Sequence, residues 1–185
     1  MKSLLTVLLF SVTLVTYCQS NFNLDTSTVT WIGEKITSQT HIGTLKFVKA
    51  SLDLENLKDP SGVFEVDMTS LTNTDLTGEG KQQLEGHLKS ADFFDVNTHP
   101  VAYVSINKVL TKKGNLYEVS GDLTIKEITH PVNFSVTILK DKITAKMTFD
   151  RTKYNIKFAS GSFFENLGDN LINDTITLDI NLNKR

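Results

Sequence analysis

Apolar and polar residues alternate through most of the chain after residue 27, and this period of two restricts the possible folds more than any other feature. In the segment 173–182, isoleucine or leucine occupies every second position from 176 to 182, and polar residues lie between them. The segments 132–138 and 142–149 show the same pattern. Successive side chains of a β-strand point to opposite faces, so these segments are predicted to be strands with one buried face.

The same reasoning predicts eight strands and one helix. The strands are expected at 28–36, 43–54, 64–68, 101–110, 117–125, 132–138, 142–149 and 173–182. In one of them the apolar phase changes between Phe47 and Val48, which indicates a β-bulge or a sharp bend. The helix is expected at 78–89, where Leu84 and Leu88 lie four residues apart and therefore on one side.

The connections between successive strands are mostly short, which favours antiparallel neighbours. Antiparallel strands with one apolar face each form either a sandwich or a closed barrel, and periodicity alone leaves both open. Closure into a barrel removes the exposed edges of the sheet. An eight-stranded barrel has an interior that side chains fill or that holds one small ligand.

The N-terminus has the pattern of a secretory signal peptide. Lys2 precedes an apolar run from residue 4 to 15, which is too short to span a bilayer, and cleavage is expected near Ser20. Residues 1–20 are therefore predicted to be a signal peptide and 21–185 a single domain that is periplasmic or secreted. Lipoprotein anchoring through Cys18 is the alternative, which the preceding Tyr17 disfavours.

Composition argues against several classes of function. The chain carries 19 basic and 21 acidic residues without a basic block, so no nucleic-acid partner is expected. No run after the signal is long and apolar enough for a transmembrane span. The four histidines match no zinc-binding spacing, and the chain has neither a Gly-x-Ser-x-Gly motif nor a phosphate-binding loop. We therefore expect no metal, no cofactor and no enzymatic activity.

Two motifs resemble those of the YceI-like family. The segment His-Leu-Lys-Ser-Ala-Asp-Phe-Phe-Asp-Val at 87–96, followed by His99 and Pro100, is similar to the family pattern His-Leu-Arg-Ser-x-Asp-Phe-Phe-Asp. The segment Gly-Asp-Leu-Thr-Ile-Lys-Glu-Ile-Thr-His-Pro-Val at 121–132 is similar to Gly-x-Leu-Thr-Ile-x-Gly-Val-Thr-x-Pro-Val. The chain departs at Lys89, where the family has arginine, and at Glu127, where it has glycine.

The resemblance implies an eight-stranded antiparallel, lipocalin-like barrel with one short helix. It also implies a periplasmic protein that binds a polyisoprenoid lipid inside the barrel and carries no catalytic residues. Because Lys89 lacks the planar fork of arginine, it does not reproduce a bidentate contact to a ligand head group.

Aromatic residues recur on the apolar rows and in the first motif, where they suit a thin hydrocarbon chain. The expected ligand-binding residues are Trp31, Phe47, Phe64, Phe93, Phe94, Tyr103, Phe134, Phe149 and Phe158 in the lining, with Lys89 and Arg151 at the head group. Phe93 and Phe94 are expected to pack in opposite directions, one into the barrel and one against the helix. A core without a cavity remains an alternative.

The resulting hypothesis is a secreted, non-enzymatic protein that holds a polyisoprenoid or similar long-chain lipid for transport, storage or sequestration. The alternative is a periplasmic stress-response or interaction module whose cavity is filled and binds no lipid. A lipid-directed hydrolase or isomerase is a third hypothesis, for which no nucleophile and base are evident. A homodimer is possible under each of them.

Overall fold

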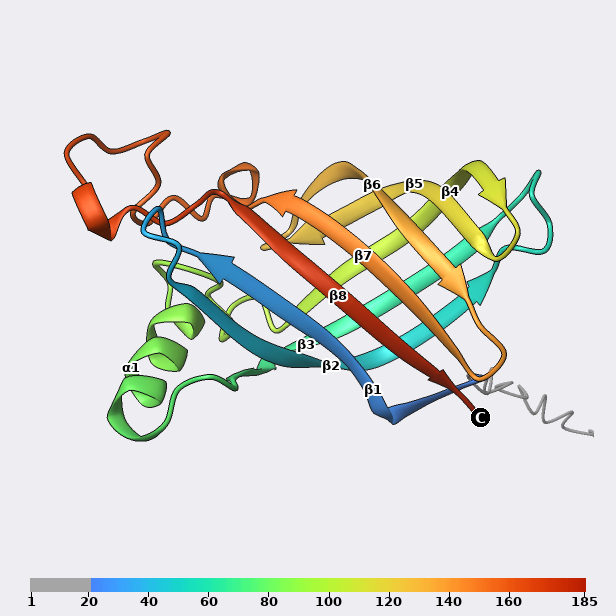
Figure 1. Ribbon diagram of the computed structural model, residues 1–185, viewed down its shortest axis with the longest axis horizontal. Coiled ribbons are helices and arrows are strands. Elements are labelled where there is room, and N and C mark those ends of the chain that lie inside the picture. The colour runs from blue at the N-terminus through green and yellow to red at the C-terminus, as the bar shows by residue number, and fades with distance from the viewer. Residues whose placement is uncertain (1–20) are drawn as a thin grey trace, which may run out of the picture.

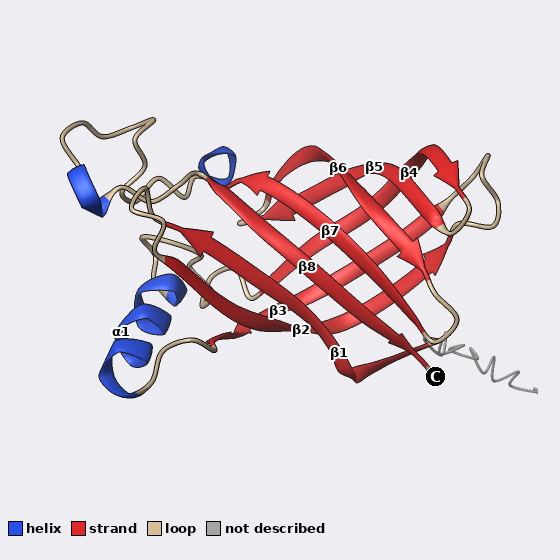
Figure 2. Ribbon diagram, viewed as in Figure 1, coloured by secondary structure: helices blue, strands red, loops and turns tan. Residues whose placement is uncertain are grey.

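The computed structural model describes residues 21–185, which form a closed barrel of eight antiparallel strands (Figures 1 and 2). The strands are β1 (Phe22–Glu34), β2 (Thr40–Asp53), β3 (Ser61–Asn73), β4 (Val101–Lys113), β5 (Leu116–Ile125), β6 (Ile128–Ile138), β7 (Lys142–Asp150) and β8 (Thr175–Lys184). The predicted signal peptide and Cys18 lie outside the described residues. The predicted fold class is confirmed.

Each strand pairs with its neighbours in the chain, and β1 closes the barrel by pairing with β8. In that closing pair, Val29 lies opposite Ile180 and Trp31 opposite Leu178, so the apolar row of one strand continues into the next. The alternation seen in the sequence therefore becomes an apolar interior and a more polar exterior. Closure leaves no free sheet edge of the kind that templates aggregation.

The bulge predicted in β2 is present. The pairing of β2 with β3 shifts between Phe47 and Lys49, and a second shift lies between Thr44 and Lys46. The shift between Phe47 and Lys49 explains how Phe47 and Ala50, which are three residues apart, both belong to the interior packing.

Several strands are longer than the apolar pattern indicates, and β1 and β3 show the reason. β1 begins at Phe22, and the polar residues that follow do not alternate because its pairing with β8 is interrupted between Asn23 and Thr28. β3 continues to Asn73, where a polar side chain turns inward and is fully buried. Where bulges and hydrogen bonds determine the end of a strand, apolar and polar residues do not alternate, so the sequence does not predict that end.

The two ends of the barrel differ (Figure 1). One end, called here the helix end, carries α1 (Gly78–Lys89) and the long connection from β7 to β8, which contains the short helices η1 (Arg151–Tyr154) and η2 (Gly168–Asn170). The opposite end, called the hairpin end, carries the connections β2–β3, β4–β5 and β6–β7 and the C-terminus. The observed helix α1 has the predicted bounds.

Candidate functional site

An apolar cavity of about 110 Å³ lies inside the barrel. All eight strands and the turn after α1 contribute to its wall. The lining residues include Trp31, Leu45, Phe47, Leu52, Phe64, Val66, Met68, Leu71, Phe94, Leu123, Phe134, Ala145, Met147, Phe149, Ile176 and Leu182. No charged residue lines it. We call this space the inner cavity.

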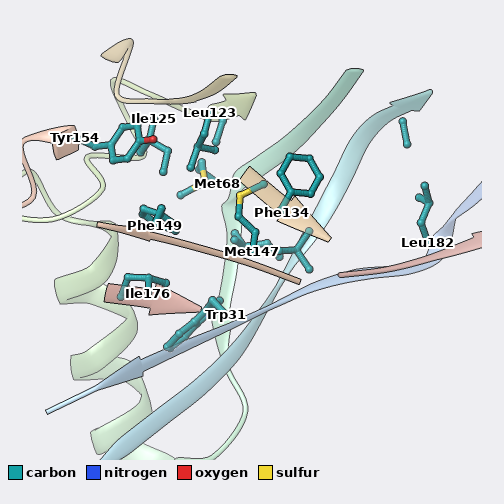
Figure 3. Packing of buried hydrophobic residues seen from close by; sticks show 14 of the residues in the cluster. Trp31, Met68, Leu123, Ile125, Phe134, Met147, Phe149, Tyr154, Ile176 and Leu182 are labelled. Carbon is teal, nitrogen blue, oxygen red and sulfur yellow. The ribbon is translucent and has the colours of Figure 1, made fainter. Parts of the chain in front are cut away.

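The wall of the inner cavity is built from the inward positions of the strands. Figure 3 shows Phe134, Met147 and Met68 from different strands gathered inside the barrel, with Trp31 and Ile176 toward the side of α1. Aromatic rings give this wall a fixed shape, whereas the two methionines are unbranched and adapt to irregular contents. A wall of this composition selects a ligand by shape and burial rather than by directed bonds.

A second pocket of about 260 Å³ lies at the helix end and is called here the mouth pocket. It shares Trp31, Phe94 and Ile176 with the inner cavity. Its wall also includes Gly33, Glu34, Lys35, Gln39, His41, Leu84, His87, Leu88, Phe93, Phe158 and Ile172. The three shared residues place the mouth pocket directly beside the inner cavity, so the apolar interior passes into a mixed polar and apolar region.

Phe93 and Phe94 differ in their surroundings, and the segment that holds them is not extended as the prediction assumed. Residues 91–94 form a turn, and the two rings meet edge to face at 5.1 Å. Phe94 lines both the inner cavity and the mouth pocket. Phe93 is buried, and its ring lies 5.7 Å from the ring of His87 on α1. The pair thus connects the helix to the interior of the barrel.

Arg151 is fully buried, with 0% of its surface exposed, and its guanidinium group donates four hydrogen bonds to backbone carbonyls. Nε donates to the carbonyl of Asn173, and one terminal nitrogen donates to the carbonyls of Ile156 and Phe158. The other terminal nitrogen donates to the carbonyl of Ile172 and pairs with Asp174 at 3.3 Å. Four of the five guanidinium N–H groups thus donate to backbone carbonyls, and Arg151 lines neither the inner cavity nor the mouth pocket.

The contacts of Arg151 hold the β7–β8 connection together. The four carbonyls span residues 156–173, and the guanidinium also lies 5.6 Å from the ring of Phe93. Burial lowers the pKa of Arg151, while the charges of Asp174 and Asp150 oppose that shift. We infer that Arg151 positions the loop that frames the mouth pocket, whereas its predicted contact with a head group stays a prediction.

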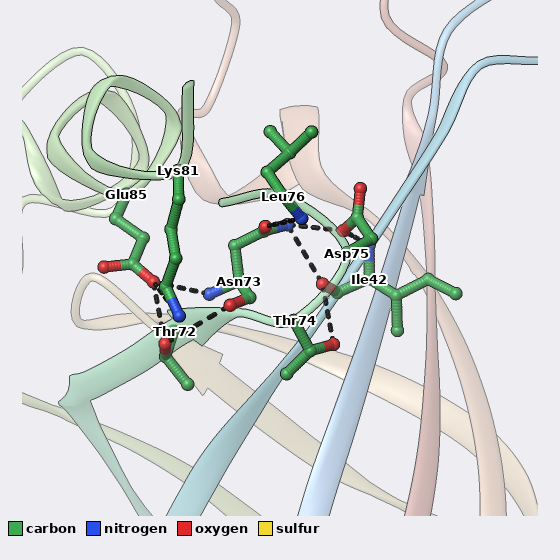
Figure 4. Close-up of polar contacts among 8 residues, drawn as sticks. All are labelled: Ile42, Thr72, Asn73, Thr74, Asp75, Leu76, Lys81 and Glu85. Carbon is green, nitrogen blue, oxygen red and sulfur yellow. Dashed lines mark hydrogen bonds and ion pairs between the residues drawn. The ribbon is translucent and has the colours of Figure 1, made fainter. Parts of the chain in front are cut away.

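A polar network fastens α1 to the barrel (Figure 4). The carboxylate of Glu85 accepts from the hydroxyl of Thr72 and from the backbone N–H of Asn73, both at 2.7 Å. The Asn73 side chain is fully buried, donates to the carbonyl of Ile42 at 3.0 Å and accepts from the N–H of Leu76 at 2.8 Å. These bonds join α1, the end of β3 and the start of β2.

Two carboxylates in this region have lowered pKa values. The hydrogen bonds from Thr72 and Asn73 hold the pKa of Glu85 below its ordinary value, against the effect of burial. For Asp75, burial raises the pKa, but hydrogen bonds from Ile42, His41 and Asn73 together outweigh it. His41 lies 2.8 Å from the same carboxylate. Both carboxylates are therefore stabilised in their charged form.

The predicted binding residues divide into three groups. The inner cavity is lined by Trp31, Phe47, Phe64, Phe94, Tyr103, Phe134 and Phe149. Of these, Tyr103 is 45% exposed, because the alternation of β4 places its side chain on the face opposite to that of Ala102 and Val104. Phe93 and Phe158 line the mouth pocket, and Phe158 comes from the β7–β8 connection rather than from a strand. Lys89 belongs to the lining of neither space.

Sequence reasoning missed the residues that organise the helix end. Asn73, Asp75 and Glu85 are ordinary polar residues in the sequence, and no spacing links them. Their partners lie on other elements, so only the folded chain shows that one of them is fully buried. Among residues 21–185, no group of three or more histidine, aspartate or glutamate side chains is arranged to hold a metal ion.

The fold and the site together define a class of protein. The chain is a closed antiparallel barrel of the lipocalin-like type, with an apolar cavity that adjoins a pocket at one end. In the described part of the chain, no helix has the length and apolar character needed to cross a membrane.

The chain belongs to the YceI-like family, because the model of the YceI-like domain matches residues 21–183. A UPF0312 protein of Pectobacterium atrosepticum is 33% identical over 82 residues, which cover 44% of this chain and 41% of that relative. A UPF0312 protein of Vibrio parahaemolyticus is 30% identical over 82 residues, or 44% of this chain and 40% of the relative. The chain thus matches less than half the length of these curated relatives.

Solved structures share the fold at low sequence identity. BcnA of Burkholderia cenocepacia has a TM-score of 0.68 at 21% identity, covering 87% of this chain and 98% of that one. A polyisoprenoid binding domain from Saccharophagus degradans, implicated in plant cell wall breakdown, has a TM-score of 0.56 at 16% identity, covering 89% and 97%. The YceI protein of Campylobacter jejuni has a TM-score of 0.56 at 15% identity, covering 100% and 99%.

Proposed function

We propose that this protein is a non-enzymatic binding protein that holds a polyisoprenoid or similar long-chain lipid in the inner cavity. The observation that carries the proposal is the wall of that cavity, to which every strand contributes apolar side chains and no strand contributes a charge. The description of the Saccharophagus degradans domain as polyisoprenoid-binding supports the same ligand class for a protein of the same fold.

Burial supplies the affinity for such a ligand. Each methylene group removed from water contributes roughly 0.8 kcal/mol. Association costs about 4–15 kcal/mol, so a chain of many carbons is needed before binding becomes tight. A long hydrocarbon chain therefore fits this wall better than a small apolar molecule does.

The size of the inner cavity adds a condition to the proposal. Its volume of about 110 Å³ lies below the roughly 300–1,000 Å³ of typical ligand sites. A long chain therefore displaces side chains of the wall or extends into the mouth pocket, which shares Trp31, Phe94 and Ile176. Met68 and Met147 are the side chains best suited to move, because each has three rotatable bonds.

The proposal also places the protein in the periplasm or outside the cell and assigns it no enzymatic activity. With residues 1–20 as a signal peptide, the barrel acts in the periplasm or outside the cell, and binding serves transport, storage or sequestration. Apart from the hydroxyl of Tyr103, the lining of the inner cavity offers no nucleophile, and it offers no charged acid or base that would support catalysis on a bound chain. The possible homodimer remains a prediction.

Mass spectrometry of an organic extract tests the proposal. The mature protein is purified without detergent from the periplasm or from outside the cell, and a stoichiometric isoprenoid or long-chain lipid is expected. A protein without lipid that also fails to bind a fluorescent long-chain probe would overturn the proposal. That result would favour the alternative of an interaction module with a filled cavity.

A pair of variants on β7 makes the test specific to the cavity. Ala145 lines the inner cavity, and Thr144 is its neighbour on the opposite face of the strand. Ala145→Phe adds a ring inside the cavity and is expected to reduce probe affinity at least tenfold. Thr144→Phe adds the same ring outside and is expected to leave affinity unchanged. Equal effects of the two substitutions would mean that the ligand is not bound inside the barrel.

A further inference from the structure

Two polar atoms lie buried without a hydrogen-bond partner on the wall of the mouth pocket. They are Nε1 of Trp31 and Nε2 of His87. Trp31 is only 8% exposed and lines both the mouth pocket and the inner cavity. Buried polar groups in native proteins nearly always have partners, because an unmet donor costs about 1–3 kcal/mol. Two such atoms in one pocket indicate a ligand that supplies the missing partners.

The indole of Trp31 is held in a fixed position. Trp31 on β1 lies opposite Gly43 on β2, and a Cβ atom added at Gly43 would collide with the indole ring. Glycine at this position therefore lets the ring lie against the backbone of the neighbouring strand. A tryptophan N–H is a donor only, so its partner must be an acceptor.

The imidazole of His87 is held by two aromatic rings. Its centroid lies 4.3 Å from that of Phe158 and 5.7 Å from that of Phe93, both in edge-to-face geometry. These contacts connect α1 to the β7–β8 connection and to the turn after the helix. Nε2 donates or accepts according to the tautomer, so it accommodates either an oxygen acceptor or a hydroxyl donor.

The charges around the mouth pocket argue against an anionic head group. The lining carries one acidic residue, Glu34, and one lysine, Lys35, which offset one another. His41 is paired with Asp75 at 2.8 Å, and Arg151 is fully buried and does not line the pocket. Phosphate groups require unpaired cations or several backbone donors. The pocket thus lacks the surplus of positive charge that a diphosphate needs.

We propose that Trp31 and His87 form a subsite for a neutral, oxygen-bearing head group, such as an alcohol, ketone or ester. This inference rests on the proposed function and deepens it. The indole N–H donates to the ligand oxygen at the junction of the two spaces, and the imidazole binds the same group from the side of α1. The ligand is thereby oriented, with its head at the helix end and its hydrocarbon chain directed toward the hairpin end.

Three matched probes test the subsite. They are farnesol, the hydrocarbon farnesene, which lacks the hydroxyl group, and farnesyl diphosphate. Affinities are measured by displacement of a fluorescent long-chain alcohol probe. We expect farnesol to bind about three- to tenfold more tightly than farnesene, which is the gain expected from one net hydrogen bond. Farnesyl diphosphate is expected to bind most weakly.

Substitutions assign the difference to named atoms. Trp31→Phe removes the N–H and keeps an aromatic ring, so farnesol is expected to lose its advantage while farnesene affinity changes little. His87→Phe on α1 is expected to give the same pattern. Phe149→Leu is the matched control, because Phe149 lines the inner cavity and offers no polar atom. This control is expected to weaken farnesol and farnesene equally.

A spectroscopic readout keeps the test independent of the folding of the variants. Trp31 is the one tryptophan of the chain, so the protein gives a single indole N–H resonance. Farnesol is expected to shift this resonance strongly, and farnesene only weakly. Equal affinity for farnesol and farnesene in the unaltered protein would overturn the subsite but leave the proposed function intact. Tightest binding of farnesyl diphosphate would overturn the neutral head group, and failure of all three probes would overturn the proposed function itself.

Discussion

The two ends of this barrel are closed by different physical means. At the hairpin end, β4 and β5 are joined by Gly114 and Asn115 alone, and β6 and β7 by residues 139–141. At the helix end, the connection between β3 and β4 contains α1, and the one between β7 and β8 runs from residue 151 to 174. Local turn geometry thus closes one end, and contacts between distant segments close the other.

The helix end also contains the most deeply buried polar groups with long-range partners. Arg151 and Asn73 are both fully buried there, and each bonds to segments far away in the sequence. Burying such groups is costly unless their hydrogen bonds are complete. Both buried polar groups lie at the end that contains the mouth pocket. Their hydrogen bonding therefore fixes the shape of the segments around that pocket.

Removal of Arg151 is expected to break the helix end most severely. Arg151→Leu leaves four carbonyls without their donor and Asp174 without its ion-pair partner, so we expect a loss of about 3–5 kcal/mol in unfolding free energy. Arg151→Lys keeps the charge but not the planar fork, and is expected to recover only part of the loss. The neighbouring exposed Lys153→Ala is the control. Denaturant unfolding measures all three, and a loss below 1 kcal/mol for Arg151→Leu would contradict the role assigned to this side chain.

The second-largest effect is expected at low pH, where protonation of carboxylates at the helix end lowers the stability of the protein. The pKa values of Glu85 and Asp75 are lowered in the folded state, so their contribution is present above their unfolded pKa values of about 4 and is lost as pH falls through the folded values. Glu85→Gln is expected to lower the unfolding free energy by about 1.5 kcal/mol at pH 7 and by progressively less as the pH falls through the folded-state pKa of Glu85. Denaturant unfolding of the original protein and of the variant, monitored by the fluorescence of Trp31 at each pH, measures the difference in unfolding free energy.

A control variant distinguishes the stability contributed by the hydrogen bonds of Glu85 from that contributed by its ion pair with Lys81. Lys81 lies 3.6 Å from Glu85 and is partly exposed, so Lys81→Ala is expected to cost less than about 0.5 kcal/mol. If Glu85→Gln cost the same at pH 3 as at pH 7, the charged form of this carboxylate would not be what fastens α1.

The smallest expected effect concerns the two-residue turns at the two ends. At the helix end, Lys126 and Glu127 connect β5 to β6 with φ values of 51° and 61°, a conformation that favours glycine. Glu127→Gly is therefore expected to stabilise the protein by about 1 kcal/mol. At the hairpin end, Gly114 has φ 60°, and Gly114→Ala is expected to destabilise by a similar amount. Thermal unfolding measures both, and a destabilising Glu127→Gly would show that the Glu127 side chain has a role that outweighs backbone strain.

Much of the fold was predictable from local patterns. The alternation placed eight strands, the phase change at Phe47 marked the bulge, and Leu84 and Leu88 marked one face of α1. The departure from the family motif at Glu127 falls on a left-handed residue, where glycine has a physical advantage. These features depend on neighbouring residues and therefore leave a periodic or local signal.

The site was only partly predictable. Inward aromatic residues such as Phe134 and Phe149 follow from strand parity. Phe158 was assigned to the same rows, but it belongs to the β7–β8 connection and is 44% exposed. Arg151 was assigned to a head group, and that contact stays a prediction; its burial and its four hydrogen bonds to carbonyls of the β7–β8 connection left no signal in the sequence. A loop residue has no periodicity, so sequence gives no measure of its burial.

The sequence by itself determined the strands, the bulge, the helix and the family resemblance, because each depends on residues that are close along the chain. Only the tertiary structure decided that β1 meets β8, that α1 and the β7–β8 connection share one end, and that Trp31 and His87 face one pocket. The physical reason is that closure of the barrel brings together residues separated by more than 50 positions. Hydrogen-bond partners at such distances are fixed by packing, which no local pattern encodes.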